Sequence, residues 1–557
     1  MSDKEGLLIN KEGYFERSGR LFVPIGVNYW PASCGMAMWR TWPETEIQKD
    51  LDLIKTLGMN SVRFFLRWSD FEPEAEFYDP SVCHRLESFL KCCSDRDLNM
   101  QMSLITGWMN GAVTWPDWAE GCNVFTDMDM HACAAGYAQR VAEIVAPFHP
   151  WMIGIDQGNE LCSTPDSMSA PVQSINHWSV LISDAIHSVY PQCLILSGNH
   201  QAQFLDDTGW RPNEQKTIDI HSLHLLPFPR MHNVLFEGMD DPLAVTVAGY
   251  YTMLFRSFGP VLIQAIGTAS TYDPEIQRRY LSKTLAECWK FGANGFFWWS
   301  LKDIDARFSP YSTHAAESAL GLVDEHNRVK PGLECFLEFT HQLPQLVRPH
   351  DKEKRIGVYW PLHYYNRQNP LNPGNKPEFL SHRMLLCDYL LKMMDYETVS
   401  VRGDLPLNDE YSILFLPGTK ITIDEAVRLE EWVKNGGKVI WHAPNPSNWG
   451  KDFSRLLGAT PMDQHSSATV TVKTFGNIWR FDTFPHATRL KLKCHSAEVI
   501  AMDDRNMPMV LANRIGKGKV AYALPMVEDS IAVDSERIVT RDRWKSWYEG
   551  MLRTVEE

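Results

Sequence analysis

Eight short apolar runs alternate with amphipathic segments between residue 21 and about residue 303, and this alternation restricts the possible folds more than any other feature. Short apolar runs that are each followed by a helical pattern are typical of parallel β/α units. Eight units in about 280 residues match a closed (β/α)8 TIM barrel in number and length. An open doubly wound sheet is the alternative, but no glycine-rich phosphate-binding motif follows the first run. The runs span 21–28, 61–66, 99–105, 152–158, 193–198, 217–223, 260–266 and 295–301.

The pattern changes after residue 342. A segment rich in proline and charge, 343–355, predicts a linker. Apolar runs and helical patterns then alternate again, as in a flavodoxin-like α/β fold, and strand-like alternation from about 465 to 526 predicts a compact β module before a terminal helix. We therefore expect three domains: a catalytic barrel over 1–342, a flavodoxin-like α/β domain over 343–462 and a small β domain with a C-terminal helix over 463–557.

Composition excludes several classes of protein. A net charge of −15 argues against binding to nucleic acid, because proteins that bind it usually carry a basic face. The sequence contains no apolar run of about 18 residues, so no membrane span is expected. The opening MSDKEGLLIN is not a signal peptide, and the twelve cysteines contain no CxxC pair. We expect a cytoplasmic protein with free, buried thiols and no metal site or cofactor.

Polar and aromatic residues follow the apolar runs at one end, which is where a barrel places its active site. Because parallel strands all end at the same rim, these side chains should lie around one opening. The chain also contains 20 tryptophans, which suit either a large aromatic core or a cleft that stacks on sugar rings; composition alone favours the core. The residues that follow the runs are Asn28, Tyr29, Trp30, Arg67, Trp68, Trp108, Asn159, Glu160, Asn199, His200 and His224.

Glu160 is the first candidate for catalysis. It ends the segment IGIDQGNE after the fourth run, where its carboxyl group would point into the mouth of the barrel, with Asn159 placed to bind a sugar hydroxyl. Hydrolysis of a glycosidic bond needs two carboxyl groups, and in a retaining enzyme they stand about 5–5.5 Å apart. A carboxylate that only caps the next helix is the alternative for Glu160.

These motifs resemble glycoside hydrolases of clan A, most closely the cellulase–mannanase family 5, over roughly residues 8 to 340. The resemblance implies that Glu160 is the acid/base and that Arg63 in SVRFF and Asn159 contact the sugar. It also implies a role in the site for the strand-six histidine, for which His224 is a better match than His221, and for Trp299 in GFFWWSLKD. A structural ion pair for Arg63 and core positions for His224 and Trp299 are the alternatives. Asn28, Trp30 and Trp108 complete the candidate set that binds substrate.

Two positions depart from the family pattern. The family commonly has a tyrosine two residues after the strand-six histidine, where this chain has Leu226. In the seventh run, PVLIQAIG places Ala265 where the nucleophilic glutamate is expected. A methyl group cannot attack an anomeric carbon. Either the glutamate was deliberately replaced or the chain is a natural pseudoenzyme, and the otherwise intact site favours a deliberate glutamate-to-alanine change.

The resemblance also suggests a substrate and an assembly. Residues 28–74 resemble the branch of family 5 that contains exo-acting β-mannosidases, some of which act on Manβ1-4GlcNAc. The C-terminal half resembles the trimerisation and β domains of family 42 β-galactosidases, which implies a homo-oligomer, with a trimer favoured. The leading hypothesis is a retaining exo-β-mannosidase acting on a short oligosaccharide. Another retaining exo-β-glycosidase, such as a β-glucosidase or β-galactosidase, and a non-catalytic carbohydrate-binding protein remain as alternatives.

Overall fold

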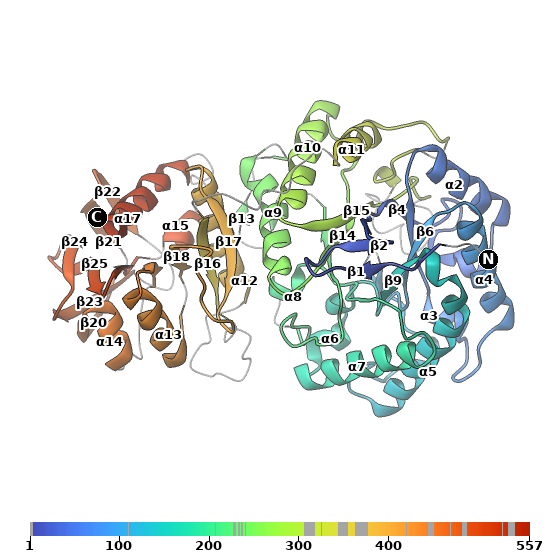
Figure 1. Ribbon diagram of the computed structural model, residues 1–557, viewed down its shortest axis with the longest axis horizontal. Coiled ribbons are helices and arrows are strands. Elements are labelled where there is room, and N and C mark those ends of the chain that lie inside the picture. The colour runs from blue at the N-terminus through green and yellow to red at the C-terminus, as the bar shows by residue number, and fades with distance from the viewer. Residues whose placement is uncertain are drawn as a thin grey trace. The chain divides into compact units, whose positions relative to one another are not determined.

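The computed structural model describes residues 4–557 except 110, 206–207, 227–229, 232–233, 236–237, 240, 306–317, 325, 344–354, 362–376, 419, 444–450, 468, 482–486, 526 and 533–540. The chain folds into two compact units (Figure 1). The first unit comprises Met1–Pro227 and Tyr251–Arg348, and the second comprises Phe228–Tyr250 and Pro349–Glu557. The expected linker at 343–355 lies almost entirely outside the described residues.

The first unit is a (β/α)8 barrel, as the sequence predicts. Its eight-stranded sheet has the order β10-β9-β6-β5-β4-β15-β14-β11, and all pairings are parallel. An isolated parallel bridge between Leu196 and Ile220 joins the two ends of this order, which closes the barrel. Each expected run overlaps one barrel strand: β4 (Ile25–Tyr29), β5 (Ser61–Phe65), β6 (Asn99–Ser103), β9 (Met152–Asp156), β10 (Ile195–Leu196), β11 (His221–Leu225), β14 (Val261–Ile266) and β15 (Ala293–Trp298).

Long helices connect the strands and surround them (Figure 1). Three begin at an aspartate that accepts hydrogen bonds from backbone amides of the first turn, Asp79, Asp127 and Asp273, and such caps satisfy amides that have no partner inside the helix. Apolar residues at helical spacing face the strands. The helices are α2 (Glu44–Thr56), α4 (Pro80–Asp95), α5 (Met128–Val145), α7 (Val172–Val189), α9 (Pro242–Arg256), α10 (Pro274–Lys290) and α11 (Pro331–Gln342).

A small N-terminal sheet closes the amino end of the barrel. It contains β1 (Leu8–Ile9), β2 (Phe15–Arg17) and β3 (Arg20–Leu21). Leu7 and Phe15 belong to a buried cluster that also contains Ile153 and Leu262, each the second residue of its barrel strand. Because this end is filled with apolar side chains, the open carboxyl end is left for chemistry.

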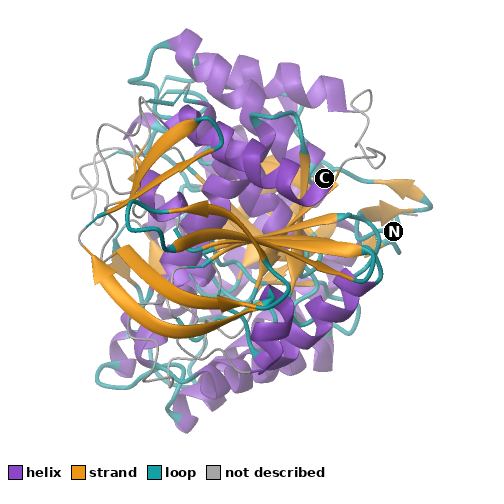
Figure 2. Cartoon of the chain, turned by 90° about the vertical axis from the view of Figure 1, so that its left-hand side faces the viewer, coloured by secondary structure: helices purple, strands orange, loops and turns teal. Residues whose placement is uncertain are grey.

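The second unit contains a seven-stranded sheet, shown with its flanking helices in Figure 2. Five parallel strands have the flavodoxin order, in which the second strand lies outside the first, and two antiparallel strands extend the sheet. The sheet order is β17 (Glu397–Arg402), β16 (Arg355–Trp360), β18 (Ile413–Pro417), β19 (Lys438–His442), β26 (Gly518–Ala523), β25 (Pro508–Ile515) and β24 (Glu498–Met502). Its helices are α12 (Pro377–Lys392), α13 (Ile423–Lys434), α14 (Lys451–Leu457), α15 (Val527–Ala532) and α17 (Lys545–Glu556).

The observed division differs from the expected one at the domain boundaries. The expected boundary at 462/463 separates strands of one sheet, because β26 pairs with β19 along its length. Only the hairpin-like pairs β20 (Ala459–Ser467) with β23 (Ala487–Cys494) and β21 (Val470–Thr474) with β22 (Asn477–Phe481) form sheets outside it among the described residues of this region. Residues 228–250, expected within the barrel domain, belong to the second unit. Such long-range pairing is invisible to a local pattern.

All twelve cysteines are free thiols, and eight of them are buried. Across the described parts of the chain, no helix is both long enough and apolar enough to cross a membrane.

Candidate active site

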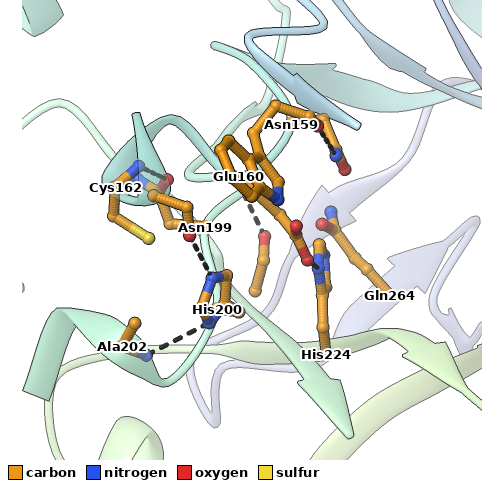
Figure 3. A network of polar contacts seen from close by, with 12 residues as sticks. Asn159, Glu160, Cys162, Asn199, His200, Ala202, His224 and Gln264 are labelled. Atoms are coloured by element: carbon orange, nitrogen blue, oxygen red, sulfur yellow. Dashed lines mark hydrogen bonds and ion pairs between the residues drawn. The ribbon is translucent and has the colours of Figure 1, made fainter. Parts of the chain in front are cut away.

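Glu160 and His224 meet at the carboxyl end of the barrel. Glu160 follows β9, His224 lies in β11, and His224 Nδ1 is 2.5 Å from Glu160 Oε1 (Figure 3). The His224 side chain is 7% exposed and the Glu160 side chain is 24% exposed, so the carboxyl group is held by one buried partner yet remains accessible. The sequence predicted both residues for the site, and the structure brings them together.

The two alternatives to a catalytic Glu160 and a site histidine at 224 can be compared with the contacts. Glu160 precedes the short helix η4 (Leu161–Ser163), but its side chain makes no capping hydrogen bond there. His221, the weaker candidate, packs edge-on against Phe255 and Phe258 in the core instead. The contacts therefore favour His224 over His221 as the residue that faces the carboxyl group.

Ala265 lies beside His224 on the neighbouring strand. The pairing of β11 with β14 matches His224 with Ala265 and Leu223 with Ile263, so Gln264 is an extra residue in a β-bulge. Ala265 is 5% exposed. A bulge re-aims side chains at a strand end, and here it brings position 265 next to the histidine that holds Glu160. A carboxylate at position 265 would therefore lie adjacent to the pair formed by Glu160 and His224.

Arg63 is the centre of a buried polar network beneath this pair. Its guanidinium group donates to Asp156 Oδ2 at 2.8 and 3.1 Å, to Asn28 Oδ1 at 3.0 Å and to Asn159 Oδ1 at 3.0 Å. Gln264 Nε2 donates to the other Asp156 oxygen at 2.7 Å. Arg63 and Asp156 are completely buried, so each charge depends on the other. The ion pair considered as an alternative for Arg63 exists, and it also fixes Asn28 and Asn159.

Asp156 and Gln264 were not among the residues predicted for the site. Both are buried polar residues inside apolar runs, in MIGIDQG and VLIQAI, and a buried charge in such a run is a signal that a partner is required. Which partner it has depends on strand order, which the local sequence does not contain.

The candidate tryptophans are mainly buried. Trp30 stacks on Phe65 with ring centroids 5.3 Å apart, and Trp299 meets the same ring edge-on at 5.7 Å. Trp30 is 2% and Trp299 is 7% exposed, so both contribute to the core, as composition favoured. Trp108 is half-buried in the two-residue strand β7 (Trp108–Met109), and its carbonyl accepts a hydrogen bond from Asn159 Nδ2 at 2.8 Å.

The pKa of the Glu160 carboxyl group depends on burial and on its charged neighbours. Burial alone raises the pKa of the Glu160 carboxyl group. The positive charges that Arg63, His200 and His224 carry when protonated act in the opposite direction, and with the hydrogen bond from His224 they lower the pKa to about 2. With alanine at position 265, Glu160 is therefore a carboxylate at neutral pH, whereas an acid catalyst must hold a proton.

Within the described ranges, no group of three or more His, Cys, Asp or Glu side chains could hold a metal ion. At position 226, Leu226 supplies no hydroxyl group to orient a residue at 265.

Comparisons with known proteins agree with this geometry. No family model and no curated protein matches the chain. Among solved structures, the exo-β-1,4-mannosidase Op5Man5 from Opitutaceae bacterium strain TAV5 is 39% identical, covers 98% of this chain and 99% of its own, and superimposes with a TM-score of 0.93.

More distant structures share the fold. A GH5_18 protein from Streptomyces cattleya in complex with GlcNAc is 21% identical over 69% of this chain and 94% of its own, with a TM-score of 0.59. Gan42B, a GH42 β-galactosidase from G. stearothermophilus, is 14% identical over 95% of this chain and 88% of its own, with a TM-score of 0.71. The full-length similarity to an exo-β-mannosidase, together with the motifs around Glu160, shows that the chain belongs to glycoside hydrolase family 5 of clan A.

Proposed function

We propose that the chain is a retaining exo-acting β-mannosidase in which alanine occupies the position of the nucleophile. The observation that carries this proposal is the pairing of Ala265 with His224, whose ring is hydrogen-bonded to Glu160. A glutamate at 265 would complete the two-carboxylate arrangement that retaining hydrolysis requires.

The mechanism follows from these two positions. In the form with Glu at 265, that carboxylate attacks the anomeric carbon while Glu160 donates its proton to the glycosidic oxygen, so the C–O bond breaks and the aglycone departs. Water then attacks the glycosyl–enzyme, Glu160 takes the water's proton, and the carboxylate at 265 is released. With Ala265, the first bond cannot form, and the site can bind sugar without turning it over.

The substrate assignment rests on similarity. Op5Man5, which resembles this chain over almost its full length, is described as an exo-β-1,4-mannosidase. A glutamate-to-alanine variant of the S. cattleya GH5_18 protein is described in complex with Manβ1-4GlcNAc. We therefore propose release of mannose from the non-reducing end of short β-mannosides, with Manβ1-4GlcNAc as one substrate. We also propose a homo-oligomer, most simply a trimer, on the resemblance of the C-terminal half to the trimerisation domain of family 42 β-galactosidases, a family to which Gan42B belongs.

Ala265 itself favours a second candidate, a non-catalytic protein that binds carbohydrate. Reversion separates the two functions. Ala265→Glu should hydrolyse aryl β-mannosides, and Ala265→Gln, which has the same size but no charge, should remain inactive. In the chain as it stands, azide or formate should restore turnover of an activated aryl glycoside and give a product of inverted configuration, because a small anion fits the space of the missing side chain. If Ala265→Glu is inert on every β-glycoside tested, the binding protein is the correct alternative.

A further inference from the structure

The turn that carries Glu160 is held by three consecutive residues that follow β10. Residues 198–200 each bind one residue of the turn 160–163, and His200 is the member with a titratable side chain (Figure 3). The three bonds are Glu160 N to Gly198 O (2.9 Å), Cys162 N to Asn199 Oδ1 (2.9 Å) and the contact between Ser163 Oγ and His200 Nε2 (2.7 Å).

The backbone of this turn is strained at Glu160. Glu160 has a φ of 51°, in the left-handed region, where a residue with a Cβ atom pays about 1–2 kcal/mol. Gly198 allows the close approach of β10, since a Cβ atom there would lie 1.8 Å from the carbonyl oxygen of Gly158. The backbone conformation that aims Glu160 into the barrel mouth therefore depends on the contacts from β10.

His200 also contacts the partner of the Glu160 carboxyl group. The rings of His200 and His224 stack with centroids 6.1 Å apart and an interplanar angle of 27°. His224 is the residue hydrogen-bonded to Glu160 Oε1. One imidazole thus touches both the turn that carries the carboxyl group and the ring that binds it.

The hydrogen bonds of His200 indicate which ring nitrogen carries the proton in the neutral form. The backbone amide of Ala202 donates to His200 Nδ1 at 3.2 Å, so this nitrogen is an acceptor. In a neutral ring the proton then lies on Nε2 and is donated to Ser163 Oγ. Protonation of Nδ1 would place two N–H groups against each other and break the bond to Ala202.

We propose that His200 is a positioning residue for the acid/base, which fixes both the Glu160 turn and the ring of His224 and whose neutral form is the Nε2–H tautomer. This inference rests on the proposed role of Glu160.

The surroundings of His200 shift its pKa in both directions. Burial lowers the pKa of His200, while Cys162 and Glu160 in the turn raise it, and His224 on β11 opposes them; together they raise it above its ordinary value. The Ala202 amide opposes protonation through the geometry of its hydrogen bond. A neutral His200 also removes one of the positive charges that lower the pKa of Glu160, which is what an acid catalyst needs.

The tautomer can be tested without catalysis. In the chain labelled with ¹⁵N-histidine, the His200 ring signals, assigned by their loss in His200→Gln, should show the Nε2–H tautomer at alkaline pH, above the raised pKa of the ring. Ser163→Ala should alter the Nε2 signal and leave the tautomer unchanged. An Nδ1–H tautomer of the neutral ring would overturn the proposal.

A kinetic test uses Ala265→Glu as background and compares two substitutions. His200→Gln keeps a donor near Ser163 but loses the ring, whereas His200→Phe keeps a ring against His224 but loses both hydrogen bonds. We expect His200→Phe to lower kcat by roughly 10–100-fold on substrates with poor leaving groups, with KM little changed and the basic limb of the pH profile displaced, because misplacement by about 1 Å can cost about 100-fold. His200→Gln should recover part of this loss.

The control is His187→Gln, which removes a comparable histidine contact, to the Cys193 carbonyl at 3.0 Å, away from the site. It should leave kcat and the pH profile unchanged. Full activity with an unchanged pH profile in both His200→Phe and Ser163→Ala would refute a positioning role. If Ala265→Glu is inert with His200 intact, the proposed function fails, and the ring signals alone decide the tautomer.

Discussion

Introducing a carboxylate at position 265 should raise the pKa of Glu160 by about 2 units. Two carboxyl groups in a retaining site stand about 5–5.5 Å apart, so at an effective dielectric constant of about 20 their charges repel by about 3 kcal/mol. At about 1.4 kcal/mol per pKa unit, this repulsion corresponds to about 2 units. The pKa of Glu160, about 2 with Ala265, would then return to its ordinary range.

The sign of the accompanying stability change follows from the direction of the shift. A carboxyl group whose folded pKa is depressed stabilises the fold above its unfolded pKa, near 4.5, and loses that contribution as pH falls toward about 2. Raising the pKa of Glu160 reduces the contribution. At neutral pH, Ala265→Glu should therefore have a lower free energy of unfolding than Ala265→Gln, and the difference should shrink on acidification.

Infrared spectroscopy of protein labelled with ¹³C-glutamate can measure the shift. The Glu160 band is assigned by its loss in Glu160→Gln. At about pH 4, close to the ordinary glutamate pKa, it should be a carboxylate in the Ala265 and Ala265→Gln forms and about half protonated in Ala265→Glu. Equal ionisation of Glu160 in all three forms would refute the reasoning, because it would mean that position 265 does not face Glu160.

Four further outcomes are expected. Ala265→Glu should hydrolyse β-mannosides faster than β-glucosides or β-galactosides and release single sugars, and a rapid fall in the viscosity of mannan would instead indicate internal cleavage. Adding Glu160→Gln should slow glycosylation far more for poor leaving groups than for activated phenols; equal, mild losses would exclude Glu160 as the acid. Arg63→Met leaves Asp156 charged and unpaired in a buried position, which should cost about 3–5 kcal/mol and lower the melting temperature, and adding Asp156→Asn should recover part of the loss. Light scattering at micromolar concentration should give a mass of two or more chains, most simply three, whereas a clean monomer would contradict the proposed assembly.

The local sequence pattern was sufficient to predict the barrel. Each of the eight apolar runs overlaps one barrel strand, because a strand buried on both faces must be apolar along its length. The domain boundaries were not predictable in the same way. Strand β26 pairs with β19, which lies some 80 residues earlier in the chain, and nothing in its alternating residues specifies that neighbour.

The sequence by itself determined the fold class, the position of Glu160 after the fourth strand and the alanine at 265, since all three follow from residue order and periodicity. Only the tertiary structure decided which side chains meet. The link of Arg63 to Asp156, the pairing of His224 with Ala265 across a bulge and the stacking of His200 on His224 depend on strand order and register. The physical reason is that burial demands a partner for every charge and polar group, while the closure of the barrel selects which partner lies within hydrogen-bonding distance.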